Sequence, residues 1–485
     1  MSSTRTLLQN QITEFDVSYN ELSCWQQVDS ETQAENEHQS LWYRHVGKAL
    51  GVLLYNAGYS PEAQRRCLDF FKKVVAPNLG VFQEASEDPK LSWKSFMTDD
   101  GTPLELSWDW GTNDSKPTIR YSIEPIGLRA GTKLDPRNLL AGPVFQDDLN
   151  RNLPDMRLES FHYLKDFFDG QKEKETSDNK LSILSRCFHF ARDFFVSLLG
   201  EGQFLEALKD HDSSIFYAFD LTEADTTAKV YFFPKYRAES MGKSNLEVIL
   251  EGIKGAPYCT ADNLPALSIF SDFSNNAASK ELEYEMLAID LIDPFQSRFK
   301  VYFRSRETSF DSLSRIITLG DRIKHTNMQQ GLKDLRCLWN AIFGVNEPSS
   351  HPLEENNHRT AGMLYNVEFR IGDQYPVAKV YLPVRHYSAS DESVINGLDE
   401  YLKSHQRSSH MTAYSRAMVK LFGPESLRSQ TGIHTYIGCT IRPNGALRLE
   451  FLLVIPARRD PCPALARLRR CNARSSNFAG RGFRL

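Results

Sequence analysis

The chain repeats one order of elements, two helical stretches followed by two extended ones, and this repeat limits its folds more than any other feature. The extended stretches are rich in β-branched and aromatic residues, and the helical stretches carry apolar residues at helical spacing. The expected strands are 103–110, 118–125, 214–221, 227–233, 284–292, 298–303, 364–371, 377–382, 434–441 and 446–455. The expected helices are 41–54, 60–75, 155–170, 181–209, 236–253, 262–279, 308–320, 328–343, 391–405 and 411–421. Five such units make an internal repeat.

Ten antiparallel strands in consecutive hairpins can form two sheets or close into a barrel. Closure removes the exposed edges, and helices between the hairpins favour a barrel inside a ring of helices. Ten strands enclose more space than side chains fill, so we expect a central cavity. We therefore predict an α/β fold with one barrel domain at 36–455, a polar N-terminal segment at 1–35 and a basic tail at 456–485.

The bulk composition narrows the class of protein. The net charge of −5 gives no basic excess for binding nucleic acid or an anionic membrane. The eight Cys form no C-x-x-C pair, the N-terminus has no apolar signal segment, and no apolar run is long enough to span a bilayer. We expect a cytoplasmic protein with reduced thiols that binds small molecules as a monomer or homodimer.

The tripeptide Lys-Val-Tyr occurs three times, each time in an expected strand, beginning at Lys229, Lys300 and Lys379. Residues i and i+2 of a strand share a face, so each Lys and its Tyr point the same way. One interpretation puts this face in solvent. The apolar neighbours Val380 and Leu382 favour the other, in which helices cover the outside and Lys and Tyr face the lumen.

A lumen of this kind is strongly cationic. Its basic residues are Arg120, Lys229, Arg298, Lys300 and Lys379. Unpaired buried cations each cost several kcal/mol, and we expect too few lumen carboxylates to pair them. Lys and Arg suit phosphate oxygens, so we predict a polyanionic ligand, a diphosphate.

The tyrosines of the repeat, Tyr231, Tyr302 and Tyr381, lie two residues beyond the lysines. Aromatic faces stabilise a cation by up to about 2 kcal/mol when desolvated and exclude water. Cations beside an aromatic cage suit ionisation of an allylic diphosphate. The sequence has no D-D-x-x-D motif for Mg²⁺, since Asp99-Asp100 and Asp147-Asp148 have the wrong context. We expect the protein cations to replace the metal, with no cofactor.

Glu105 lies on the first expected strand and shares its face with Ser107 and Asp109. A lumen Glu can accept a hydrogen bond from an acceptor's N–H or O–H and so activate its ring. The alternative is a structural Glu that pairs with one of the basic residues.

Several segments together resemble one family. They are 103–108, 119–127, 130–136, the three Lys-Val-Tyr strands and Thr435-Tyr436. Between about residues 40 and 442 the chain resembles the fungal dimethylallyltryptophan synthase family of aromatic prenyltransferases. The resemblance implies an ααββ prenyltransferase barrel, in agreement with the repeat, that transfers dimethylallyl from dimethylallyl diphosphate to an aromatic atom without Mg²⁺.

The resemblance also implies roles for individual residues. Arg120, Lys229, Arg298, Lys300 and Lys379 would hold the diphosphate. Tyr231, Tyr302, Tyr381 and Tyr436 would shield the cation. Glu105 would hydrogen-bond the acceptor.

Two departures from the family pattern affect the expected function. Tryptophan-specific members carry a Lys on the strand before the first Lys-x-Tyr, and here 214–220 has none. This favours a phenolic polycycle, such as a xanthone or related polyketide, over free tryptophan, with an indole diketopiperazine or other indole as alternative.

The last strand also lacks the family's tyrosines, and 456–485 has eight Arg, no Lys and one acid. That break favours a shifted reading frame or an unremoved intron over a genuine basic, disordered tail.

Two further hypotheses differ in chemistry. In one, water or a small alcohol accepts the prenyl group, although Glu105 argues against it. In the other, the barrel only binds a phosphorylated isoprenoid or nucleotide, which would need the cations but not the tyrosines.

Overall fold

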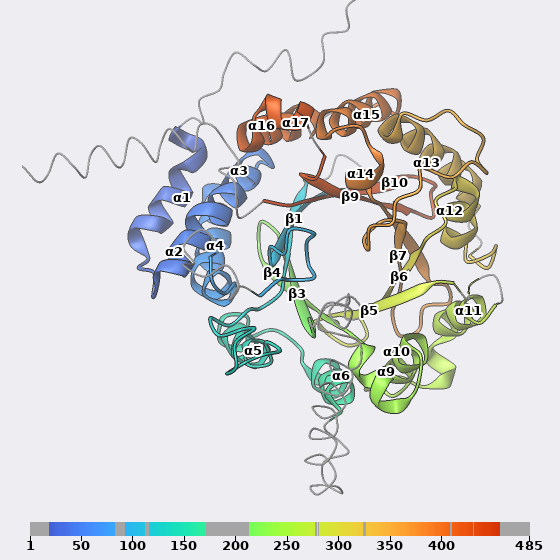
Figure 1. Cartoon of the computed structure of the whole chain (residues 1–485), viewed down its shortest axis with the longest axis horizontal. Helices are drawn as coiled ribbons and strands as arrows, with labels where there is room; N and C mark the ends of the chain where they lie inside the picture. The colour runs from blue at the N-terminus through green and yellow to red at the C-terminus, as the bar shows by residue number, and fades with distance from the viewer. Residues whose placement is uncertain are drawn as a thin grey trace, which may run out of the picture.

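The structure is a computed structural model, and it describes residues 19–82, 93–111, 116–170, 213–276, 279, 281–323, 326–407, 410–429 and 431–455. Ten strands form a closed antiparallel barrel in which each pairs with its neighbours in sequence and β1 pairs with β10 (Figure 1). The strands are β1 (Leu104–Gly111), β2 (Thr118–Ile123), β3 (Ile215–Leu221), β4 (Thr226–Phe232), β5 (Glu283–Asp290), β6 (Phe299–Ser305), β7 (Met363–Phe369), β8 (Val377–Leu382), β9 (His434–Ile441) and β10 (Leu447–Leu453). The predicted barrel is confirmed.

Helices surround the barrel (Figure 1). They are α1 (Tyr19–Glu31), α2 (Glu37–Trp42), α3 (Lys48–Asn56), α4 (Pro61–Phe70), α5 (Ala141–Asn152), α6 (Glu159–Asp169), α9 (Lys235–Met241), α10 (Asn245–Lys254), α11 (Pro265–Ser274), α12 (Phe310–Ile317), α13 (Met328–Phe343), α14 (Val384–Tyr387), α15 (Asp391–Ser404), α16 (Met411–Phe422) and α17 (Pro424–Ser429). Within the described residues, none is long and apolar enough to cross a membrane.

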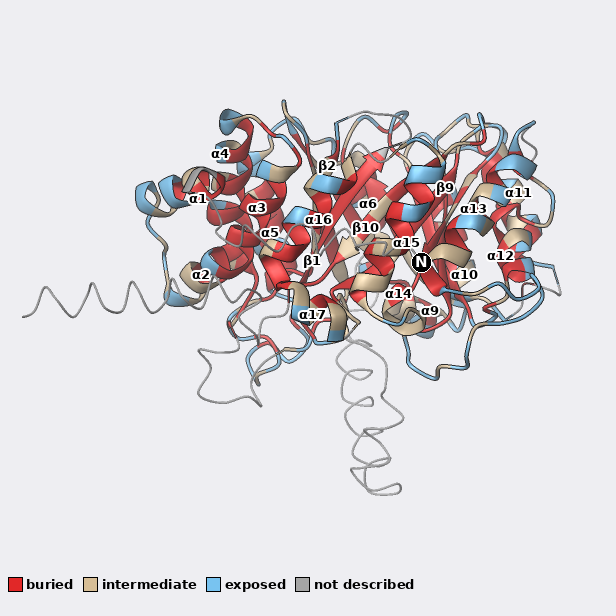
Figure 2. Cartoon of the chain, turned by 90° about the horizontal axis from the view of Figure 1, so that it is seen from above, coloured by how far each residue is buried: buried red, intermediate tan, exposed pale blue. Residues whose placement is uncertain are grey.

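Side chains alternate along each strand between the helix-covered outside of the barrel and its lumen. On β6, Phe299, Val301 and Phe303 face the helices, and the Phe303 ring lies 6.0 Å from that of Phe270 on α11. Lys300 and Tyr302 point into the lumen, where both line cavities. The apolar core therefore forms a continuous layer between sheet and helices, and the burial pattern follows it (Figure 2).

Local signals explain several helix ends. Ser60 caps α4 by accepting a hydrogen bond from the Ala63 amide, and Pro61 occupies the first turn, where its missing N–H costs no helical hydrogen bond. The helix expected at 236–253 is instead two helices. Gly242, with φ of +63°, ends α9, and a capping box at Ser244 begins α10.

Other expectations differ from the structure. Residues 1–35 were predicted as a polar segment, but α1 packs on α3 and α4 and buries Leu22 and Val28. Its apolar residues are too sparse to give a clear helical period. Helix α5 was not predicted, and the helix expected at 262–279 is the shorter α11. The helix expected at 181–209 and the tail at 456–485 lie outside the described residues.

Candidate active site

The barrel lumen contains two chambers. One has a volume of about 80 Å³, and half of the residues that line it are basic, so we call it the cationic chamber. The other, of about 150 Å³, is lined by aromatic, apolar, hydroxyl and acidic groups together with Arg304, Arg385 and His386, and we call it the acceptor chamber. Tyr231, Tyr302, Tyr381 and Glu450 line both, so they form the boundary.

The structure places all five predicted cations in the cationic chamber. They are Arg120 on β2, Lys229 on β4, Arg298 just before β6, Lys300 on β6 and Lys379 on β8. Two further arginines line it, Arg442 after β9 and Arg448 on β10. Sequence reasoning missed both because it examined the last strand pair for tyrosines. Arg448 precedes Glu450 by two residues, and this i, i+2 relation was the available signal.

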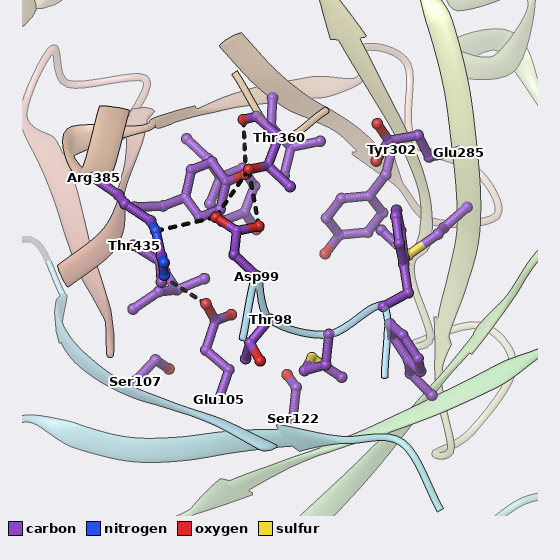
Figure 3. Close-up of a pocket in the computed structure, with 18 of the residues that line it drawn as sticks. Thr98, Asp99, Glu105, Ser107, Ser122, Glu285, Tyr302, Thr360, Arg385 and Thr435 are labelled. Carbon is purple, nitrogen blue, oxygen red and sulfur yellow. Dashed lines mark hydrogen bonds and ion pairs between the residues drawn. The ribbon is translucent and has the colours of Figure 1, made fainter. Parts of the chain in front are cut away.

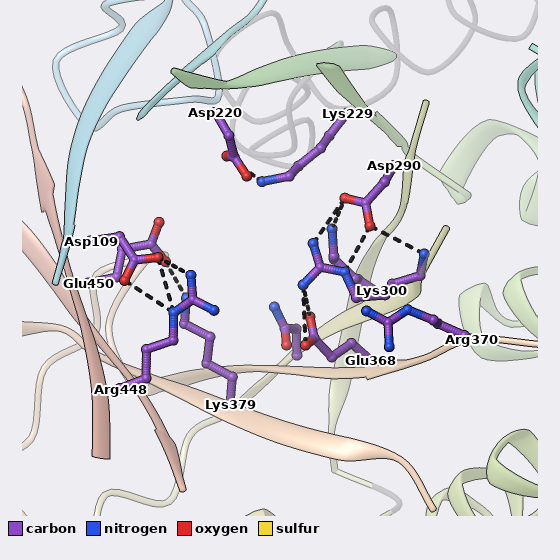
Figure 4. A network of polar contacts seen from close by, with 12 residues as sticks. Asp109, Asp220, Lys229, Asp290, Lys300, Glu368, Arg370, Lys379, Arg448 and Glu450 are labelled. Atoms are coloured by element: carbon purple, nitrogen blue, oxygen red, sulfur yellow. Dashed lines mark hydrogen bonds and ion pairs between the residues drawn. The ribbon is translucent and has the colours of Figure 1, made fainter. Parts of the chain in front are cut away.

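The prediction that the lumen has too few carboxylates was wrong. Five carboxylates lie among the cations: Asp109, Asp220, Asp290, Glu368 and Glu450 (Figure 4). Most come from the strand next to the one that carries the cation. Asp220 on β3, for example, accepts a hydrogen bond of 2.5 Å from Lys229 on β4. The Lys-Val-Tyr strands alone could not reveal such cross-strand partners.

Asp290 is the centre of one group of charges. Its carboxylate accepts hydrogen bonds from Lys300 Nζ at 2.5 Å and from Arg298 Nε at 2.8 Å. Burial disfavours the charged form, but Lys300 and Arg298 outweigh it and hold the Asp290 pKa far below its usual range. Burial lowers the pKa of Lys300 to about 8, since the attraction of Asp290 is opposed by the nearby charges of Arg298 and Lys229.

Arg120 is the centre of the second group. Its guanidinium lies 2.6 Å from Asp109, 2.8 Å from Asp220 and 3.0 Å from Glu450. These carboxylates raise the Arg120 pKa well above normal despite burial. Arg448 pairs with Asp109 and Lys379 with Glu450 (Figure 4). The cationic chamber is therefore an ordered network of ion pairs with more basic than acidic groups.

The three repeat tyrosines form a wall between the chambers. The Tyr231 and Tyr302 rings are 5.6 Å apart and the Tyr302 and Tyr381 rings 6.2 Å apart. Asn366 donates a hydrogen bond of 3.2 Å to the Tyr381 hydroxyl. Tyr436 stands edge-on to Tyr381 at 6.3 Å and lines only the acceptor chamber. All four predicted tyrosines thus surround one space.

Glu105 lies on the floor of the acceptor chamber (Figure 3). It accepts a hydrogen bond of 2.6 Å from the Thr435 hydroxyl, and no ion pair of the described residues includes it. Burial raises the pKa of Glu105 to about 8, with added repulsion from Glu450 and Asp99 and partial relief from Thr435. Glu105 is therefore mostly a neutral carboxylic acid at pH 7, while Glu450 is held ionised by Lys379 and Arg120 against the effect of burial.

Loops and the short helix α14 form the opposite side of the acceptor chamber. Asp99, on the segment before β1, pairs with Arg385 at 3.1 Å and accepts a hydrogen bond from the Thr360 hydroxyl (Figure 3). Deeper in, Arg304 pairs with Glu285 at 2.9 Å. The sequence showed Asp99 only as part of an unsuitable Asp-Asp pair and predicted none of the other groups, because these distant segments meet only in the folded chain.

Asp99, His358 and His386 bring metal-capable atoms within 4.8 Å of one another, the one such group of the described residues. The Thr360 hydroxyl lies 2.7 Å from His386 and 2.9 Å from His358, and Arg385 pairs with the Asp99 carboxylate. The hydrogen bonds of Thr360 and the ion pair of Asp99 therefore explain why these three side chains lie close together. Its two imidazoles also differ from the oxygen ligands that Mg²⁺ prefers.

Comparison with known proteins identifies the family. The model of the tryptophan dimethylallyltransferase family matches residues 38–417. A 4-O-dimethylallyl-L-tyrosine synthase of Claviceps purpurea is 34% identical over 415 residues, 84% of this chain and 85% of that protein. Xanthone prenyltransferase B of Emericella nidulans is 28% identical over 88% of this chain and 89% of that protein.

Solved structures agree on the fold. The crystal structure of AnaPT from Neosartorya fischeri superposes with a TM-score of 0.71 at 23% identity, over 89% of this chain and 98% of that one. The fold, the match to the family and the extent of the relatives lead to one conclusion. The chain belongs to the tryptophan dimethylallyltransferase family of fungal aromatic prenyltransferases.

Proposed function

We propose that the chain transfers a dimethylallyl group from dimethylallyl diphosphate to a phenolic acceptor, without a metal ion. One observation carries the proposal: a cationic chamber and an acceptor chamber share a wall of three tyrosines. The diphosphate would occupy the first chamber and the acceptor ring the second. The allylic group would then lie at the wall, where the two meet.

The cationic chamber suits a diphosphate by charge and geometry. Arg120 and Arg298 line this chamber, and Lys300 and Lys379 reach into it from opposite sides, so donors surround the space (Figure 4). Arg442 and Arg448 add further positive charge. Basic groups exceed the carboxylates, and a bound polyanion balances the excess. Preorganised cations stabilise the charge that develops on a leaving diphosphate, which is the task Mg²⁺ performs elsewhere.

The tyrosine wall suits the second half of the ionisation. When the allylic C–O bond breaks, both electrons leave with the diphosphate and a cation remains. The ring faces of Tyr231, Tyr302 and Tyr381 stabilise such a cation and keep water from it. An acceptor atom then attacks with its own electron pair and loses a proton. A barrel that only bound a phosphorylated isoprenoid would have no need of this wall.

A phenolic acceptor fits the other chamber best. A cavity of similar size holds one benzene ring, so the 150 Å³ chamber suits one ring of an acceptor whose remainder extends to the loops. Glu105 can accept a phenolic proton once ionised, and the lumen face of β3 offers Phe216, Ala218 and Asp220 but no Lys. Relatives that act on tyrosine oxygen and on xanthones support the same class.

The test is an assay of dimethylallyl diphosphate with L-tyrosine, xanthones, naphthols, tryptophan and indole diketopiperazines, with EDTA present, read by mass spectrometry. We expect prenylation of at least one phenol and undiminished activity in EDTA. Product from none of the acceptors would contradict the proposal, and activity only with Mg²⁺ would contradict its metal-free form.

An indole acceptor is the second candidate. The matching family model and a 7-dimethylallyltryptophan synthase of Aspergillus fumigatus, 31% identical over 82% of this chain, favour it. The same assay separates the two, because a clear preference for tryptophan or an indole diketopiperazine over every phenol would replace the phenolic proposal.

A further inference from the structure

Glu450 occupies a position where the chain departs from the pattern of the other hairpins. In β4, β6 and β8 the residue two places after the lumen cation is a tyrosine, but after Arg448 it is Glu450. Glu450 lines both chambers and its side chain is only 12% exposed. A carboxylate thus stands at the boundary where the prenyl diphosphate would be ionised.

All the donors to Glu450 come from the site itself. The carboxylate accepts hydrogen bonds from Arg120 Nη1 at 3.0 Å, from Ser107 Oγ at 3.1 Å and from Lys379 Nζ. Arg120 and Lys379 are two of the five cations assigned to the diphosphate. In the structure, Glu450 therefore holds groups that the substrate needs.

The backbone is shaped for the contact between Lys379 and Glu450. Gly438 on β9 lies in register between Tyr381 on β8 and Glu450 on β10. A Cβ at Gly438 would come within 2.7 Å of Lys379 Cε and 3.0 Å of its Nζ. The Lys379 side chain therefore crosses the space above Gly438 to reach Glu450, which a larger residue would obstruct.

We propose that Glu450 is an exchangeable counter-anion of the diphosphate site. It neutralises Lys379 and Arg120 in the empty barrel, and these cations exchange it for diphosphate oxygens when a ligand binds. The inference rests on the proposed function, because it requires that the cationic chamber binds diphosphate. It goes further by assigning Glu450 a role in ligand exchange.

The exchange matters most after the reaction. The allylic C–O bond has broken, the acceptor has formed its new bond to the prenyl carbon, and inorganic diphosphate remains among the cations. Release of such an anion from a strongly basic chamber is slow unless another anion takes its place, and product release limits many enzymes. Glu450 can retake Lys379 and Arg120 as the product leaves. Its low pKa keeps it charged for this purpose.

The test measures binding of inorganic diphosphate to the full chain by calorimetry at fixed ionic strength. Glu450→Gln removes the competing charge, so we expect Kd to fall about tenfold, equal to 1.4 kcal/mol. Steady-state turnover should fall while the single-turnover rate is kept, because release becomes slower. Glu285→Gln is the matched control: it removes another partly buried carboxylate, paired with Arg304 in the acceptor chamber, and should leave this Kd unchanged.

The outcomes separate the two proposals. No diphosphate binding by the unmodified chain would contradict the proposed function. Normal binding by the unmodified chain, with Kd unchanged or higher in Glu450→Gln, would contradict the exchange and make Glu450 an organiser of the site. Equal tightening in Glu285→Gln would also contradict it.

If Glu450→Gln does not fold, Gly438→Ala is the second variant. It displaces Lys379 without changing the charge and should lower the Kd for diphosphate by a smaller factor. An unchanged Kd in Gly438→Ala would overturn the proposal.

Discussion

The two chambers are built in different ways. The cationic chamber is made almost wholly of strand residues, each held by a barrel register and by ion pairs such as Lys300 to Asp290. The acceptor chamber has strand residues such as Glu105 on one side, but its other side includes Asp99 from a loop and Arg385 from the short helix α14. Strands hold side chains more rigidly than loops do. The cationic chamber therefore rests almost entirely on the rigid barrel, whereas part of the acceptor chamber rests on loops and a short helix, which tolerate change more readily.

Changes in the two chambers should therefore affect different quantities. Those in the cationic chamber should alter diphosphate binding and ionisation for every acceptor. Those in the acceptor chamber should alter transfer to one acceptor and leave diphosphate binding alone. Four predictions test this separation.

Glu105→Gln should have the largest effect. A lost general base reduces transfer by roughly 10²- to 10⁴-fold, while the Kd for diphosphate should stay constant. In the unmodified chain, kcat/KM should rise with pH towards a plateau above about 8, because the buried carboxyl accepts a proton only when ionised. The variant should lose this limb of the profile. An unchanged pH profile would remove Glu105 from proton transfer.

Lys300→Ala should come next. It removes a charge-assisted contact to the diphosphate worth about 1.5–3 kcal/mol, so binding and kcat/KM should fall roughly 10- to 150-fold with every acceptor. Lys165→Ala, at an exposed ion pair with Asp169 on α6, is the control and should have no effect. Unchanged diphosphate affinity in Lys300→Ala would exclude Lys300 from the binding site.

Tyr302→Ala should have a smaller effect with a distinct product. Loss of one ring costs up to about 2 kcal/mol of cation stabilisation and opens the wall to water. The fraction of dimethylallyl alcohol among the products should rise, as measured by gas chromatography, while diphosphate affinity changes little. Tyr302→Phe keeps the ring and should behave like the unmodified chain. An unchanged alcohol fraction in Tyr302→Ala would contradict the shielding role.

Asp99→Asn should have the smallest effect. It weakens the ion pair between Asp99 and Arg385, which lies at the acceptor chamber. At such a partly exposed site this ion pair contributes at most about 1 kcal/mol. KM for the acceptor should rise a few-fold, with kcat and diphosphate affinity unchanged in steady-state kinetics. A loss of diphosphate binding would show that the chambers are not independent.

The sequence predicts features that depend on a pattern within one strand, but not contacts between separate segments. The barrel and the lumen position of Lys229, Lys300 and Lys379 follow from alternation within single strands, which a sequence displays directly. Asp220 and Asp290 were missed as partners because pairing across strands depends on register. Arg385, on the short helix α14, and Thr360, on a loop, were missed because no periodic pattern links segments that meet only in the fold. Helix α1 was missed because its buried face is short.

The most direct measurement is a crystal structure with a non-hydrolysable thio-analogue of dimethylallyl diphosphate and a phenolic acceptor. We expect diphosphate oxygens within hydrogen-bond distance of Arg120, Lys300 and Lys379, the prenyl group against Tyr231, Tyr302 and Tyr381, and the acceptor ring beside Glu105. A diphosphate in the acceptor chamber, or an acceptor ring among the basic residues, would contradict this expectation.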